Sequence, residues 1–214
     1  MPDIDDVSRR VLRLAGMRID PVANGPFATG FDRAISIRPR DGGEAVTVPL
    51  PDGAKIAGTR WSHRSDMLAV STVSDNGQQL LIVSVDDPKN PRMLTDQLST
   101  VMGGYDWMPD GQSILCQTVP AGRGDEPTMS LVPLGPNVQE SIGNASPTRT
   151  YQDLLASPYD EDLFEHYAIN QLTLLGVDGS SKFPGKPAIL SGVEIAPDGE
   201  HLLVTTVKRP FSYL

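Results

Sequence analysis

Trp107-Met-Pro-Asp-Gly111 is a turn sequence, and the alternating stretch Ser113-Ile-Leu-Cys-Gln-Thr-Val119 follows it directly. The same succession of a turn and a strand-like stretch occurs twice more, beginning at Trp61 and at Ile195. Trp107 lies 46 residues after Trp61 and 88 residues before Ile195, which is one and two units of about 44. A period of roughly 40–50 residues is typical of a four-stranded β-propeller blade. We therefore predict an all-β fold, a partial β-propeller of about three to four blades of four antiparallel strands.

The inside of each unit supports this interpretation. After the strand-like stretch 67–73, Ser74-Asp-Asn-Gly77 predicts a hairpin turn, because Asn and Gly tolerate a positive φ. The β-branched stretch 79–85 then predicts the next strand. An earlier partial unit repeats this order, with strands predicted at 34–37 and 45–48. The strands of successive units should thus lie in equivalent places.

The double spacing between Trp107 and Ile195 predicts one blade with a large insertion, at about 120–168. The third and fourth strands of that blade are then expected at 171–177 and 187–190. An alternative is that Met129-Ser-Leu-Val132 forms a true blade strand. With either assignment, residues 1–214 constitute one partial propeller domain.

The insertion is expected to end in a helix. Thr150 and Ser157 are both predicted N-caps, the latter followed by Pro158 at the first helical position. A single helical face holds Leu163, Phe164, Tyr167 and Ala168, and it should pack on the propeller.

Composition excludes several classes of protein. Eighteen Lys and Arg against 27 Asp and Glu give a net charge of −9, which disfavours a nucleic-acid binder. The single cysteine, Cys116, excludes a disulfide framework and a cysteine-based zinc site, and we expect it to be a buried structural thiol. No apolar stretch is long enough to span a membrane, and no signal peptide precedes the acidic start. We therefore expect a protein that binds neither nucleic acid nor membrane and that is cytoplasmic as the sequence is given, an expectation that does not hold if the N-terminus is truncated.

Four stretches resemble the N-terminal propeller of the prolyl oligopeptidase family, in its plastid-type glutamyl endopeptidase branch. They are 14–21, 135–141, 148–155 with 159–164, and 208–214. The resemblance implies a serine peptidase in which a propeller admits peptides to a C-terminal α/β-hydrolase domain with a Ser-Asp-His triad. The sequence contains no Gly-x-Ser-x-Gly, so we expect no catalytic residue in this chain, which alone should be inactive.

Without the insertion, the sequence is shorter than four units, whereas closed propellers have 4–8 blades. An open arc leaves strand edges unpaired, so we expect either a fragment of a longer peptidase or closure with another chain, and we favour the fragment. The alternative function is a stand-alone, non-catalytic propeller-like module for protein interaction. The partners implied by the resemblance are a peptide substrate, through the intact enzyme, and the hydrolase domain.

Three residues near the end of the sequence are candidate substrate-facing or domain-interface residues. Arg209, Phe211 and Tyr213 combine a cation with two aromatic rings directly after an apolar strand. A cation there would suit an acidic substrate side chain, in keeping with the resemblance to a glutamyl-specific peptidase. The competing interpretation is a turn at the edge of a blade, with both rings in the core.

The remaining polar motifs predict no chemistry. Ser62 and His63 are neighbours on an extended segment and should point to opposite faces, so they form no dyad. A catalytic base needs a nucleophile and an orienting acid nearby, and we expect no chemical role for His166, on the inserted helix, or for His201, at the start of a strand. The acidic group Asp160-Glu161-Asp162 fits a solvated helix N-terminus. We predict neither a metal nor a cofactor.

Overall fold

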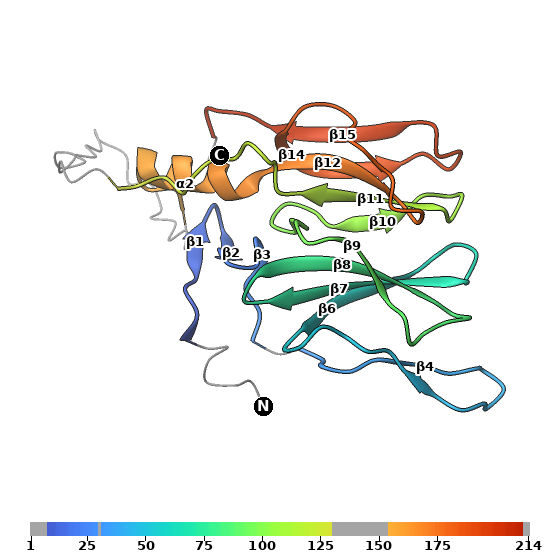
Figure 1. Cartoon of the computed structure of the whole chain (residues 1–214). Coiled ribbons are helices and arrows are strands. Elements are labelled where there is room, and N and C mark those ends of the chain that lie inside the picture. The colour runs from blue at the N-terminus through green and yellow to red at the C-terminus, as the bar shows by residue number, and fades with distance from the viewer. Residues whose placement is uncertain (1–7, 30, 130–153, 212–214) are drawn as a thin grey trace, which may run out of the picture.

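The computed structural model describes residues 8–29, 31–129 and 154–211. Antiparallel sheets dominate this part of the chain, and helix α2 (Pro158–Ala168) accompanies them (Figure 1). The all-β class with a helical insertion is therefore confirmed. The sheets are compatible with propeller blades, and they do not close on themselves in the described residues.

One sheet shows the predicted blade in full. Its strands are β6 (Lys55–Trp61), β7 (Met67–Ser74), β8 (Gly77–Ser84) and β9 (Arg92–Thr95), paired in that order. Ser74 pairs with Gly77 across a two-residue turn, and the φ of Gly77 is +112°, a conformation that favours glycine. Successive strands are therefore joined as meander hairpins.

The next sheet is the blade with the insertion. It comprises β10 (Tyr105–Trp107), β11 (Ser113–Thr118), β12 (Ile169–Gly176) and β13 (Ser181–Lys182). Although residues 119–168 separate β11 from β12, the two strands pair along their whole shared length, from Ser113↔Gly176 to Thr118↔Gln171. The insertion thus enters and leaves the sheet at one place.

The last two strands correct one prediction. Residues 187–190 are expected to form the fourth strand of the inserted blade, but they belong to β14 (Ala188–Ile195). That strand meets β12 at two residues and pairs along its length with β15 (Leu202–Val207). The fourth place beside β12 is taken by β13. Because β13 ends at Lys182, the apolar residues from Ala188 onward form the first strand of the next unit.

Two small sheets lie N-terminal to the blades. The first comprises β1 (Leu12–Leu14), β2 (Met17–Asp20) and β3 (Gly25–Pro26). The second comprises β4 (Ser36–Ile37) and β5 (Val46–Thr47), which are shorter than the predicted strands at the same places.

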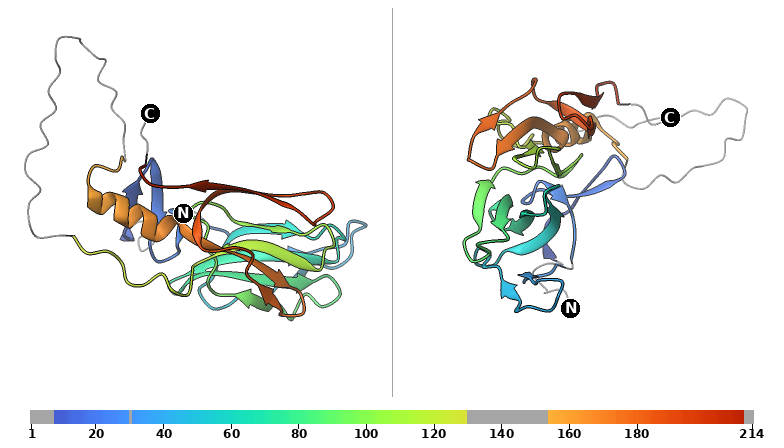
Figure 2. Two further views of the ribbon diagram at one scale, coloured as in Figure 1. Left: turned by 90° about the horizontal axis from the view of Figure 1, so that it is seen from above. Right: turned by 90° about the vertical axis from the view of Figure 1, so that its right-hand side faces the viewer.

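Helix α2 closes one end of the molecule. Its N-cap is Ser157, whose side chain accepts a hydrogen bond from the Asp160 amide, and Pro158 occupies the first turn. The predicted apolar face is buried and packs with residues of β1 and β2, at the end of the molecule where Figures 1 and 2 both place these elements. The predicted cap Thr150 lies outside the described residues, as does most of the alternative strand 129–132.

The core between the two blades is centred on Trp107. This indole is 1% exposed and donates a hydrogen bond from Nε1 to the Arg60 carbonyl oxygen, at 3.0 Å. Around it pack buried residues of both sheets, including Ala69, Leu80 and Ile114. The junction thereby fixes β6 beside β10, and this arrangement positions the site described next.

Candidate functional site

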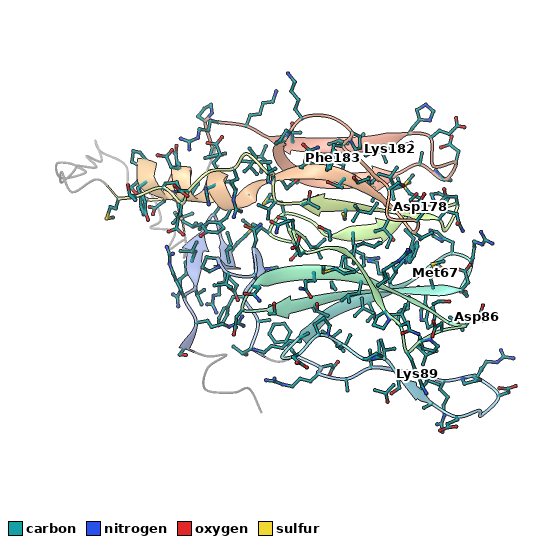
Figure 3. The ribbon with its side chains drawn as sticks, viewed as in Figure 1. Met67, Asp86, Lys89, Asp178, Lys182 and Phe183 are labelled. Atoms are coloured by element: carbon teal, nitrogen blue, oxygen red, sulfur yellow. The ribbon has the colours of Figure 1, made fainter. Side chains whose placement is uncertain are left out.

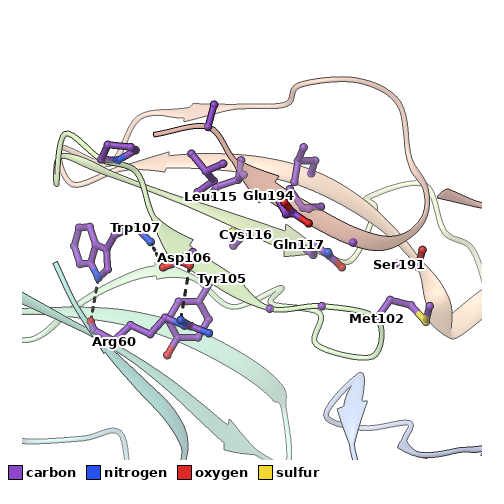
Figure 4. Close-up of a pocket in the computed structure, with 18 of the residues that line it drawn as sticks. Arg60, Met102, Tyr105, Asp106, Trp107, Leu115, Cys116, Gln117, Ser191 and Glu194 are labelled. Atoms are coloured by element: carbon purple, nitrogen blue, oxygen red, sulfur yellow. Dashed lines mark hydrogen bonds and ion pairs between the residues drawn. The ribbon is translucent and has the colours of Figure 1, made fainter. Parts of the chain in front are cut away.

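A groove of about 940 Å³ follows the first strands of the successive sheets. The end of β6, the whole of β10 and the second half of β14 line it, together with Met102, Gly103 and Gly104 (Figure 4). Because these strands occupy the same place in each unit, the groove is a product of the repeat. In the described residues, β10 and β14 do not pair with each other across it.

Charged side chains stand on the β6 and β10 walls. Arg60 forms an ion pair with Asp106, at 3.7 Å, and its guanidinium lies 5.9 Å from the centre of the Tyr105 ring (Figure 4). Both members of the ion pair are more than half exposed, so solvent screens their attraction. Both charges therefore stay accessible to a ligand in the groove.

Gln117 supplies a buried polar group at the end of the groove near Met102. Its side chain is almost fully buried, and its Oε1 has no hydrogen-bond partner among the described residues. A Cβ at Gly103 would lie 2.2 Å from Gln117 Nε2, so any larger residue there would displace this amide. An unpaired buried carbonyl costs about 1–3 kcal/mol, and a ligand N–H that reached it would recover that free energy.

Tyr105 separates the groove from a smaller cavity beside β6. Burial raises the pKa of its phenol, and the neighbouring Ser71 opposes the rise only in part. The hydroxyl is thus neutral at physiological pH and does not act as a base there.

Cys116 is confirmed as a buried free thiol. Burial raises its pKa to about 12, so almost none of it is thiolate near neutral pH. Ser62 donates a hydrogen bond to Asp66 Oδ1 at 2.8 Å and accepts one from the Met67 amide, as a turn residue does. His63 is exposed beside it. Neither side chain is therefore an activated nucleophile.

Arg209, the candidate cation, lies against helix α2. Its guanidinium contacts carboxylates at 2.6 Å (Asp162), 2.6 Å (Glu165) and 3.5 Å (Glu161). Phe211 packs edge to face on Phe164 with 5.1 Å between ring centres, while Tyr213 lies outside the described residues. These contacts account for Arg209 and Phe211 within this chain, and their part toward a substrate or another domain stays a prediction.

The other polar candidates are dispersed. His166 lies on α2, and His201 lies in the turn between β14 and β15. In that turn, side-chain atoms of Asp198, Glu200 and His201 fall within 4.8 Å of one another, all exposed. Asp198 accepts a hydrogen bond from the Glu200 amide, which is the ordinary geometry of such a turn. This cluster therefore needs no ion to explain it.

Sequence reasoning did not single out Gln117 or Tyr105 as site residues. A signal for Gln117 exists in the pair Gly103-Gly104 before a short strand, since glycine there permits a close approach. Tyr105 follows the same pair and begins β10. Nothing local in the sequence indicates that these residues face β14 across a groove.

Comparison with known proteins extends this picture. No protein-family model matches the chain. Two curated plant proteins, one of Oryza sativa subsp. japonica and one of Arabidopsis thaliana, are each 32% identical to it along its whole length. Both are named "Probable glutamyl endopeptidase, chloroplastic".

The chain covers 24% of the length of each plant protein, so it corresponds to about a quarter of such a peptidase.

Among the helices of the described part, none has the length and apolar character needed to cross a membrane. The chain is therefore related over its whole length to the glutamyl endopeptidase branch of the prolyl oligopeptidase family, and the resemblance drawn from its sequence is confirmed.

Proposed function

We propose that this chain is a non-catalytic part of a serine peptidase and that its groove forms one wall of the passage by which peptides reach a catalytic domain. The observation that carries the proposal is the groove of about 940 Å³ along β6, β10 and β14, at one end of which the buried Oε1 of Gln117 has no partner among the described residues. An extended peptide presents backbone N–H groups, which are the donors that this oxygen lacks. The kinship with plant glutamyl endopeptidases supports a peptide as the ligand.

The groove suits an extended chain in two further ways. Ser191, Gly192 and Glu194 of β14 face it from one side, and the Arg60–Asp106 pair faces it from the other. Mixed charges and hydroxyls allow polar contacts along a peptide without demanding one sequence. The groove residues contribute contacts and shape, and bond cleavage belongs to the catalytic domain.

The test is peptide binding with a matched pair of variants. A blocked ten-residue peptide of Ala and Ser is titrated into the chain while the ring resonances of His63, which lines the groove, are followed by NMR. We expect Gln117→Leu to weaken binding at least threefold, and the exposed Gln112→Leu to leave it unchanged. Absence of a His63 shift, or equal affinity in both variants, would refute the proposal.

The second candidate, a stand-alone interaction module, is favoured by the exposure of β15. Leu203 is 64% and Val204 40% exposed on a strand whose outer edge has no partner among the described residues. Size-exclusion chromatography separates the candidates. A defined oligomer supports the module, whereas a monomer or ill-defined aggregate supports the peptidase part.

A further inference from the structure

A second cavity, of about 800 Å³, lies on the α2 side of the molecule, away from the groove. The segment 119–127, the second half of α2 and the connection after β13 enclose it. Much of its wall is apolar, with three prolines and Phe183, which is 62% exposed in the connection that follows β13 (Figure 3). Small-ligand pockets are typically lined by apolar side chains of this kind.

Arg123 is the notable charged group in this cavity. It is half-buried, its Nη1 donates a hydrogen bond to Asn24 Oδ1, and its guanidinium lies 5.5 Å from the centre of the Tyr167 ring. No carboxylate pairs with it in the part of the chain that the structure describes. Burial lowers the pKa of its guanidinium, which still remains protonated at neutral pH.

Neighbouring arginines differ from Arg123 in this respect. Arg9 pairs with the buried carboxylate of Asp20 at 2.6 Å, and Arg10 pairs with Glu126 at 2.6 Å. Arg209, at the rim of the same cavity, contacts three carboxylates. A partly desolvated cation without an anion is costly, so a bound anion would be favoured beside Arg123.

We propose that this cavity binds a peptide carboxylate, with Arg123 as the anion-binding residue and Phe183 and the prolines as the apolar wall. The site is separate from the groove and goes beyond its proposed role. The carboxylate has two sources, an acidic side chain or a C-terminus. Three carboxylates also line the cavity: Asp125 is exposed at its rim, and Asp162 and Glu165 form ion pairs with Arg209. Their negative charge repels a bound carboxylate, so we expect a weak, millimolar affinity.

The three histidines of the chain allow binding to be located. His166 lines this cavity, His63 lines the groove, and His201, in an exposed turn, lines neither of them. The probes are acetyl-Phe-Glu-amide, acetyl-Phe-Gln with a free C-terminus, and the neutral acetyl-Phe-Gln-amide. We expect at least one charged probe to shift the His166 ring resonances with an affinity fivefold or more above that of the neutral probe, and its identity assigns the source.

Variants test the role of Arg123 itself. Arg123→Met should abolish the preference for the charged probe, and Arg123→Lys should retain part of it. Arg92→Met, which removes the same charge from the exposed end of β9, should change nothing. Thermal unfolding of each variant verifies that the fold survives the loss of the Asn24 contact. Equal binding of charged and neutral probes, or unchanged binding in both Arg123 variants, would overturn the proposal.

The outcome for this site is distinguishable from that for the groove. If the charged probes shift only His63, the carboxylate site is refuted while the groove remains a peptide site. If they shift only His166, the carboxylate site stands whatever the result at the groove. The carboxylate site is also refuted if no histidine resonance shifts with any probe at concentrations up to 20-fold above the expected millimolar dissociation constant.

Discussion

Trp61 and Trp107 occupy the same place in successive units, at the end of the first strand before a turn, yet they differ in exposure. Trp107 is 1% exposed and Trp61 is 50% exposed. Trp107 packs against a complete preceding blade, whereas the unit before Trp61 contributes only the short strands β4 and β5 in the described residues. Burial of this repeat position therefore depends on the neighbouring sheet and not on the residue type.

The largest effect expected from this contrast concerns stability. Trp107→Ala should lower the free energy of unfolding by about 3–5 kcal/mol, because it leaves a cavity between the sheets and removes the hydrogen bond to Arg60. Trp61→Ala should cost less than about 1 kcal/mol, as an exposed side chain does. Urea unfolding of both variants measures the difference, and equal losses would contradict the contrast.

The buried junction also protects Cys116. With a pKa of about 12 and 1% exposure, this thiol should react at pH 8 roughly a thousandfold more slowly than a free cysteine. Ellman's reagent applied with and without 6 M guanidinium measures the protection. Rapid labelling of the native chain would show that the junction opens readily, and labelling of Trp107→Ala should be faster than that of the wild type.

A smaller effect is expected at the contact between segment 119–127 and α2. The pKa of Glu126 is lowered, mainly by the hydrogen bond from Arg10, and Tyr167 donates a further hydrogen bond to it. A carboxylate with a lowered folded-state pKa stabilises the fold above its usual pKa of 4.5, and this contribution is lost as the pH falls through the folded-state value.

Glu126→Gln should therefore reduce stability by about 0.5–1 kcal/mol at pH 7, since the pair is partly exposed, and by less at pH 3. Thermal unfolding at both pH values measures this difference. Glu44→Gln, at an exposed residue just before β5, serves as the control with the same change of charge. A loss that is equal at both pH values would contradict the pairing.

The smallest change in stability is expected at β15, the exposed edge strand. Ala69 in β7 is fully buried, but Leu203, at the equivalent place in β15, is 64% exposed. Leu203→Lys should alter the free energy of unfolding by less than about 0.5 kcal/mol, yet raise solubility, because a lysine on an edge strand opposes edge-to-edge pairing. Light scattering against protein concentration measures the gain, and Gln112→Lys, which adds the same charge in an exposed turn, controls for a general effect of lysine.

Much of the fold follows from local patterns. The turn at Ser74–Gly77, the strand after each repeated turn and the buried face of α2 are all predictable from residue type and spacing. The assignment of 187–190 to the wrong unit has a physical cause. Apolar residues suit a fourth strand and a first strand equally, and the decision rests on pairing, since this stretch meets β12 at two residues and pairs with β15 along its length.

Less of the candidate site follows from sequence. Arg209 and Phe211 are conspicuous in sequence, but the carboxylates of α2 that contact Arg209 are more than 40 residues away. Gln117 and Arg123 attract no attention as isolated residues. Their interest comes from burial without a full set of partners, which depends on the packing of distant segments.

The pairing of β11 with β12 across residues 119–168 has a consequence for how this chain can vary. Because both ends of the intervening segment leave the sheet side by side, its length is uncoupled from the geometry of the blade. The entropic cost of closing such a loop rises only by about 0.6 kcal/mol with each doubling of its length. Added residues between 119 and 168 should therefore leave the register of β11 with β12 unchanged.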